Sequence, residues 1–302
     1  MKYAAVLRWL APAIFVLALF AVLMGLFDQT PGQPYPLTSF RGERVTINAR
    51  GLYYWDTVSS AAQQQANDLI MLAVGLPLLA VAAWRAWRGS LRGQLLLAGT
   101  LAFILYTYMS MCMLTAYNGL FLVYVALFAL SLWAFALSLA AVDVAGLPAR
   151  FAARFPRRWV AALLLGMAAF LALAWLGRVS NELLNPQTPP ALENATSRVI
   201  QAMDLALIVP LAGVGGLLLW RGRPWGYLLG AVAVLKGLSM TLAVSAMGLN
   251  MALAGVPESL GFMAPFLVLT ALNLLAAVAL LRGVEGEPAR EPAAGGMMPQ
   301  LH

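Results

Sequence analysis

Apolar runs of roughly 18 or more residues, long enough to cross a bilayer as helices, recur along the whole chain and constrain its fold more than any other feature. Inside hydrocarbon, backbone polar groups must be satisfied within a helix or within a closed barrel. Barrel strands alternate apolar and polar residues, whereas these runs are uniformly apolar. The sequence therefore predicts an all-α membrane protein.

The composition agrees with this class. Of the 302 residues, 62% are hydrophobic and 10% are charged, whereas soluble domains carry roughly 25% charged residues. A net charge of +7 would suggest a nucleic-acid partner in a soluble protein. Here the arginines lie in short turns between apolar runs, where they set topology and contact lipid headgroups. We expect the lipid bilayer as a partner and no nucleic acid, and the composition leaves the oligomeric state open.

Residue types that carry metal and nucleophilic chemistry are scarce. The single cysteine, Cys112, lies inside an apolar run, and the single histidine, His302, is the last residue. This argues against a metal site with histidine ligands and against a Ser–His pair. We expect no metal and no cofactor, and the sequence favours a non-catalytic protein over an enzyme.

One helix–turn–helix stretch occurs twice, at 67–103 and at 201–237. Each copy has an Asp-Leu pair near the start of an apolar run, at Asp68 and Asp204, and one proline inside that run, Pro77 or Pro210. A Trp/Arg/Gly turn and a second apolar run follow. Because each proline removes a helical hydrogen bond, we expect a distortion at both positions.

Around these stretches the chain divides into eight predicted transmembrane helices, at 4–27, 65–84, 94–116, 120–142, 160–176, 199–220, 225–247 and 262–281. Each half has the same order of spans, outer loops and inner turns, and four spans per half give both halves the same orientation. We predict two parallel four-helix repeats, 1–145 and 146–282, related by an axis along the membrane normal. Residues 283–302, rich in Gly, Pro and Ala, read as a disordered cytoplasmic tail.

Lys2 and Arg8 precede the apolar stretch of the first span, which is the charge pattern of a signal peptide. The stretch is long for such a segment and has no small-x-small cleavage site, which favours a retained helix. The long outer loop at 28–66 contains alternating apolar residues at Val45, Ile47 and Ala49 and a turn at 50–51. This pattern predicts a short β-hairpin, which we interpret as a cap on the bundle rather than as a ligand-binding lid.

The distribution of basic residues sets the orientation. Thirteen lie on one side, in the N-terminal segment, the inner turns and the tail, and five lie in the outer loops. The excess of Lys and Arg marks the cytoplasmic side. We therefore expect a multi-pass membrane protein with both termini in the cytoplasm.

Several segments resemble a group of uncharacterised bacterial polytopic inner-membrane proteins. They are GLYYWD at 51–56, WRGSLRGQLLLAGTLAF at 87–103, AYNGLFLVYVALFALSL at 116–132, MDLALIVP at 203–210, RGRPWGYLL at 221–229 and LKG at 235–237. The resemblance covers both halves up to Arg282. It implies a bacterial origin and a location in the cell inner membrane, and it carries no activity.

Ionisable residues inside the apolar runs are the candidate site, because burying one at a helix centre costs roughly 2.5–3.5 kcal/mol. Asp68 and Asp204 each lie 17 residues before an inner-turn arginine, Arg85 or Arg221, which places both roughly 25 Å from that turn. Lys236 lies close to the midplane. We expect Asp204 and Lys236, on consecutive antiparallel helices, to form an ion pair that either fixes helix register or belongs to a ligand or ion site.

Asp68 has no membrane lysine nearby in its own half. The candidate hydrogen-bond partners lie at a similar depth on the next helix and turn: Tyr106, Tyr108, Tyr117 and Asn118. Exposure of Asp68 to the outer water layer is nevertheless the favoured interpretation. We include Asp68, Asp204, Lys236 and Tyr106 in one candidate substrate-binding site. A covalent role for Lys236, such as a retinal Schiff base, fits a lone midplane lysine but does not fit eight spans in two repeats.

Two classes of function follow. The first is a small-molecule or ion transporter, or a membrane ligand-binding protein, with a site between the repeats. The second is a non-catalytic anchor, sensor or accessory subunit of a larger complex. A lipid-modifying enzyme would need clustered carboxylates or histidines that the chain does not offer. A polar cavity that contains Asp204 and Lys236 would favour the first class, and a closed pair in a dry interface would favour the second.

Overall fold

The computed structural model describes residues 3–185, 192–257 and 259–285. Within these residues, eight helical segments are long and apolar enough to cross a membrane, at 4–27, 58–87, 91–113, 121–140, 157–184, 199–220, 224–253 and 264–283. The eight predicted spans are therefore confirmed as candidate spans. The predicted tail lies outside the described residues from 286 onward.

Six spans are continuous helices: α1 (Ala4–Phe27), α4 (Leu91–Met113), α5 (Phe121–Ala140), α6 (Arg157–Leu184), α9 (Pro224–Leu253) and α10 (Ser259–Gly283). Their starts follow familiar capping rules. Ser90 precedes α4 and its side chain accepts the backbone N–H of Gly93, which satisfies one of the free donors of the first turn. α9 begins with Pro224, whose missing N–H has no partner to lose at that position.

The other two spans are interrupted by π-helical segments, which precede the prolines predicted to distort them. One consists of α2 (Val58–Ile70), η1 (Met71–Gly75) and α3 (Leu76–Trp87), and the other of α7 (Val199–Met203), η3 (Asp204–Ile208) and α8 (Val209–Trp220). Pro77 and Pro210 each lie two residues after a π segment. A proline cannot donate to the carbonyl four residues earlier and its ring clashes with it. The wider π turn accommodates this, and such turns are frequent at functional sites.

A two-stranded hairpin lies in the first outer loop, as predicted. β1 (Tyr35–Thr38) pairs antiparallel with β2 (Arg44–Ile47), and Val45 and Ile47 point inward along β2. The predicted location of the turn is wrong, because β2 pairs with the preceding segment through a turn containing Gly42 (φ +83°). On the side of the 50–51 turn there is a single isolated bridge, between Ile47 and Thr57.

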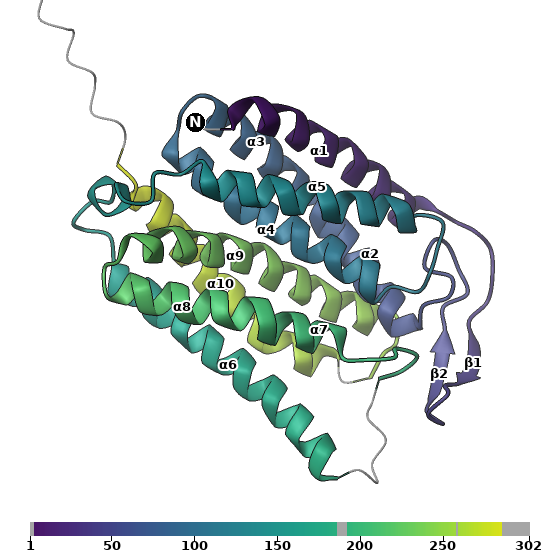
Figure 1. Ribbon diagram of the computed structural model, residues 1–302. Helices are drawn as coiled ribbons and strands as arrows, with labels where there is room; N and C mark the ends of the chain where they lie inside the picture. The colour runs from purple at the N-terminus through teal and green to yellow at the C-terminus, as the bar shows by residue number, and fades with distance from the viewer. Residues whose placement is uncertain (1–2, 186–191, 258, 286–302) are drawn as a thin grey trace, which may run out of the picture.

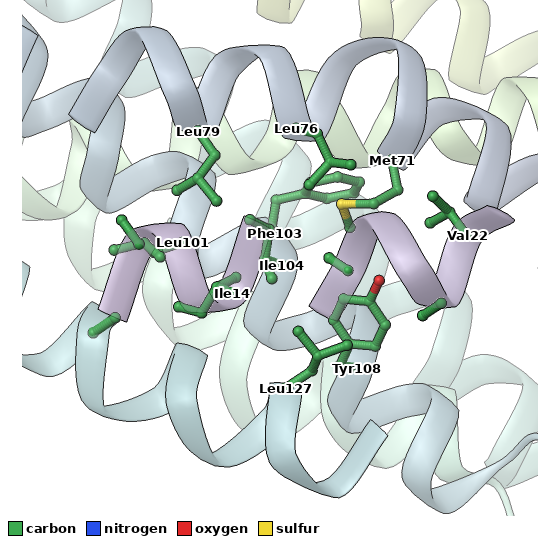
Figure 2. Packing of buried hydrophobic residues seen from close by; sticks show 14 of the residues in the cluster. Ile14, Val22, Met71, Leu76, Leu79, Leu101, Phe103, Ile104, Tyr108 and Leu127 are labelled. Atoms are coloured by element: carbon green, nitrogen blue, oxygen red, sulfur yellow. The ribbon is translucent and has the colours of Figure 1, made fainter. Parts of the chain in front are cut away.

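The first half of the chain packs around a stripe of small and apolar residues on α1. Leu7, Ala11, Ile14, Ala18 and Ala21 recur every three or four positions and are all buried, so they share one helix face. Figure 2 shows side chains of α1, α3, α4 and α5 meeting in this cluster. Since lipid tails are as apolar as these residues, close van der Waals packing holds the helices together.

α4 and α9 are the central helices of the bundle. In each, 72% of the apolar window is buried, against at most 44% in the other spans of the described chain. α4 contacts both α9 and α5, and α9 contacts α2, α8 and α10. Figure 1 shows the β1–β2 hairpin at one end of the bundle and both ends of the described chain at the opposite end.

The hairpins α3–α4 and α8–α9 correspond element by element at a constant spacing of 133 residues. α3 and α8 end at Trp87 and Trp220, and each is followed two residues later by a glycine with positive φ. The next helices begin at Leu91 and Pro224. The preceding π segments and prolines keep the same spacing.

Each hairpin also contains one glycine at a close backbone approach. A Cβ on Gly93 would lie 2.5 Å from the backbone nitrogen of Ala86, and one on Gly226 would lie 2.1 Å from that of Leu219. Because glycine has no Cβ at these two positions, the two antiparallel helices can meet directly after a tight turn.

Candidate functional site

Asp204 is the centre of a buried polar cluster in the second half. It is 9% exposed and is the first residue of the π segment η3. Tyr106 on α4 donates its hydroxyl to Oδ1 at 2.7 Å, and Trp175 on α6 donates its indole N–H to Oδ2 at 2.8 Å. Both carboxylate oxygens therefore already have a donor from the protein, one from each half of the chain.

Lys236 on α9 is 3% exposed, and its Nζ lies 3.9 Å from the centroid of the Tyr106 ring. The predicted direct ion pair with Asp204 is wrong. In the described part of the chain, the salt bridges are those of Glu182 with Arg178 and Arg198, and no hydrogen bond of the Lys236 ammonium is found. Tyr106 connects the two groups instead: its ring face contacts the cation, and its hydroxyl donates to the carboxylate.

In this arrangement the Lys236 ammonium is the group of the cluster that can still bind a guest. A cation over an aromatic face gains about 2 kcal/mol or more when desolvated, which is less than a buried ammonium loses on leaving water. Asp204, by contrast, is satisfied by two donors. An anionic guest would complete the environment of Lys236, whereas an amine would not.

A cavity of about 380 Å³ adjoins the cluster. Asp204, Lys236 and Tyr106 line it, together with Trp175 and Gln201. Much of its wall consists of apolar residues from α6, α8, α9 and α10, such as Leu164, Phe170, Leu211, Met240 and Phe266. The volume lies within the roughly 300–1,000 Å³ range of small-molecule pockets, which combine apolar walls with a few polar groups.

The mouth of the cavity lies at the hairpin end of the bundle and is lined by the segment 192–198. The first outer loop holds this segment in place. Arg41 donates to the carbonyl of Ala195 at 2.9 Å, Glu43 accepts the backbone N–H of Glu193 at 2.9 Å, and Thr57 donates to the Glu193 carboxylate. The loop thus links the first half of the chain to the entrance of a site located mainly in the second half.

Asp68 does not belong to this site. It is 2% exposed, so the predicted exposure to outer water is wrong, and its partner is Tyr53 of the outer loop, which donates to Oδ2 at 2.5 Å. Burial and the Asp68 carboxylate raise the pKa of Tyr53 well above its usual value, which keeps the phenol a donor. A Cβ on Gly25 would lie 1.9 Å from Oδ2, so α1 seals this pair. Tyr106, considered as a partner of Asp68, serves Asp204 instead.

Asp68 and Asp204 do not occupy corresponding positions of the two hairpins. At the spacing of 133 residues, Asp204 corresponds to Met71, which is the first residue of η1 as Asp204 is of η3. Lys236 corresponds to Phe103 on α4. Met71 and Phe103 are each 0% exposed and both lie beside Gly75, and Figure 2 shows their side chains in contact range within the core. The first half therefore has an apolar pair where the second half has a carboxylate and an ammonium.

Two residues of these networks were not identified from the sequence. Trp175 lies near the end of the predicted span 160–176, whose other residues are apolar. Tyr53 lies in a loop where it was assigned to the membrane interface. Each hydrogen bond depends on a tertiary approach between elements that no local pattern specifies. Among the described residues, no group of three or more His, Cys, Asp or Glu side chains could hold a metal ion.

No family model, curated protein or solved structure matches this chain.

Asp56 is a buried carboxyl outside the spans, immediately before Thr57, the N-cap of α2. It is 3% exposed; Ser60 and the backbone N–H of Ala116 donate to Oδ1, while Oδ2 has no partner among the described residues. Burial, with a smaller contribution from Glu193, raises its pKa to about 6 despite these hydrogen bonds.

The raised pKa of Asp56 predicts that stability falls as the pH rises. Below pH ~4 the carboxyl is protonated in both states, and between pH ~4 and ~6 only the unfolded state loses the proton. The folded state then loses roughly 3 kcal/mol from this group. Asp56→Asn should therefore raise the unfolding temperature at pH 7.5 and leave it nearly unchanged at pH 4, as measured by intrinsic fluorescence. An equal shift at both pH values would contradict the assignment.

Proposed function

We propose that this integral membrane protein binds a small molecule or ion that enters from the hairpin end and reaches Lys236, as a transporter or as a ligand-binding membrane protein. The observation that carries the proposal is the Lys236 ammonium. It is almost fully buried and lines a cavity without a hydrogen bond in the described chain. Charged groups within membrane spans mark substrate and ion pathways by default.

The comparison of the two halves supports a functional role over a register-fixing one. We take the halves as two parallel repeats, on the basis of the constant spacing of their central hairpins. The first repeat packs Met71 against Phe103 without any charge at this position. The fold therefore does not need Asp204 and Lys236 to set the register of these helices. An anchor or accessory subunit would have no use for a charged cavity, and we do not favour that alternative.

The same proposal assigns the hairpin end to the outer side of a bacterial inner membrane. The basic turns at 85–92 and 221–223 and both ends of the described chain lie at the opposite end of the bundle. The positive-inside rule would place that end in the cytoplasm.

Cysteine accessibility tests the proposal. Lys236→Cys, in a Cys112→Ala background and in proteoliposomes, should react with a membrane-impermeant methanethiosulfonate reagent supplied at the hairpin end. Phe103→Cys is the matched control, because it occupies the corresponding position in the first half and is 0% exposed. We expect labelling at 236 and none at 103. Absence of labelling at 236 from either side, in a protein that elutes as a folded species, would overturn the proposal.

A further inference from the structure

The charges and walls of the cavity define which class of ligand fits beside Lys236. We infer that the site takes a monoanionic amphiphile, a carboxylate on a compact apolar body, with its acid group on the Lys236 ammonium and its body between α6 and α10. This inference rests on the proposed function and adds to it the chemistry of the ligand.

The contacts of the charged residues around the cavity single out Lys236 as the group left for a guest. Among the described residues that line the cavity, three are basic (Lys236, Arg178 and Arg198) and two are acidic (Asp204 and Glu193). The two arginines bind Glu182 near the mouth. Asp204 accepts from Tyr106 and Trp175. Among these charged residues, Lys236 is thus the group without a hydrogen-bond partner in the described chain, and its ammonium is left to bind a guest.

A single anionic group bound to one ammonium is consistent with a carboxylate. A phosphate monoester carries nearly two charges and three acceptor oxygens at neutral pH, and such groups are usually bound by several donors or by a bidentate arginine. Beside Lys236 the other donors of the cluster, the Tyr106 hydroxyl and the Trp175 indole, already point at Asp204. A carboxylate carries one negative charge and needs fewer hydrogen-bond donors than a phosphate.

The rest of the cavity requires an apolar body. Around Lys236, its wall includes Met167, Phe170 and Leu171 of α6, and Phe266 and Leu269 of α10. These two helices approach each other at the inner side, where the Asn273 amide contacts the Met167 sulfur at 3.4 Å. A free inorganic anion would leave this apolar surface unfilled, and a hydrophilic solute would gain nothing from it. An apolar chain or ring would fill it by packing.

The acid can enter from the outer solution or from the bilayer. In both cases its carboxylate binds the Lys236 ammonium. A soluble short-chain acid would enter at the mouth beside the segment 192–198, whereas a long-chain fatty acid would enter sideways between α6 and α10. Chain length separates the two sources without changing the group that binds Lys236.

Ligand-induced thermal stabilisation in lipid nanodiscs tests the inference, since a ligand that binds only the folded state raises its stability. Octanoate should raise the unfolding temperature in a saturable manner, and the neutral octanamide should not. Lys236→Met should weaken octanoate binding roughly 10- to 100-fold, the value of one charged hydrogen bond, and Lys236→Arg should retain most of it. Palmitate in the nanodisc lipid, compared with octanoate in solution, identifies the source.

Equal stabilisation by octanoate and octanamide, or octanoate binding that survives Lys236→Met, would overturn the ligand class. So would a wild-type protein that octanoate fails to stabilise at all. If such a result accompanies clear labelling of Lys236→Cys, the proposed function stands and the carboxylate assignment fails. If position 236 is also unlabelled, the proposed function fails as well.

Discussion

Gly226→Ala should prevent folding, with a loss of stability of about 4–5 kcal/mol, the range reached by severe single substitutions. The added Cβ would lie 2.1 Å from the backbone nitrogen of Leu219 and 2.3 Å from the carbonyl carbon of Leu218. Both atoms belong to the backbone of α8, so no side-chain rotation can relieve the overlap. The α8–α9 hairpin would have to separate, and α9 is one of the two central helices. The yield of monodisperse protein after detergent extraction measures the effect.

The matched control for this prediction is Gly166→Ala. Gly166 lies within α6, and a Cβ there meets no atom within 4 Å. Alanine is the better helix former by up to about 1 kcal/mol, so this variant should be as stable as the wild type or slightly more so. Gly93→Ala, which places a Cβ 2.5 Å from the Ala86 nitrogen, should behave like Gly226→Ala. Normal folding of Gly226→Ala would show that the close approach of α8 and α9 is wrong.

Asp204→Ala should destabilise the protein by about 3–5 kcal/mol, as expected when one member of a buried charge pair is removed. The substitution would leave the Lys236 cation without a nearby negative charge and would remove the acceptor of both Tyr106 and Trp175. Lys236→Met in the same chain should restore most of the loss, because it removes the uncompensated charge. Thermal unfolding of the two single variants and the double variant, in one detergent, measures this coupling.

The corresponding apolar pair of the first half supplies a stricter version of the same experiment. Asp204→Met combined with Lys236→Phe reproduces Met71 and Phe103 in the second half. If the charges serve a ligand and not the fold, this variant should be at least as stable as the wild type and should lose binding of the carboxylate probe. A double variant that fails to fold would show that Asp204 and Lys236 are structural, in contradiction to the proposed function.

The spans were predictable from the sequence because a long apolar run has one outcome in a bilayer. The prolines were equally informative: a residue without an N–H must disturb a helix wherever it lies inside one, and π segments precede Pro77 and Pro210. The strand 44–47 was predictable from its alternation. Its partner was not, because either flanking segment could satisfy the same backbone groups.

The site was less predictable, for a reason visible in Asp68 and Asp204. Both are membrane aspartates at the same distance from an arginine turn, yet Asp68 is sealed by Gly25 and Tyr53, and Asp204 borders a cavity. The free-energy cost of burying a charged side chain marks a residue as a candidate. It does not identify the neighbouring group that compensates the charge. That depends on contacts between distant segments, such as the hydrogen bond between Tyr106 and Asp204, 98 residues apart.

The amine of Lys236 in the wild-type protein offers the most direct test of the central claim. That claim is that the Lys236 amine is accessible from the hairpin end and binds the ligand. The chain contains only two lysines, Lys2 and Lys236. Peptide mass spectrometry can therefore follow Lys236 in the wild-type protein without any substitution. We predict that a membrane-impermeant acetylating reagent added at the hairpin end modifies Lys236 in the folded protein, and that octanoate slows the reaction. Modification of Lys236 only after the protein is unfolded would contradict the account and leave the cluster as a closed structural element.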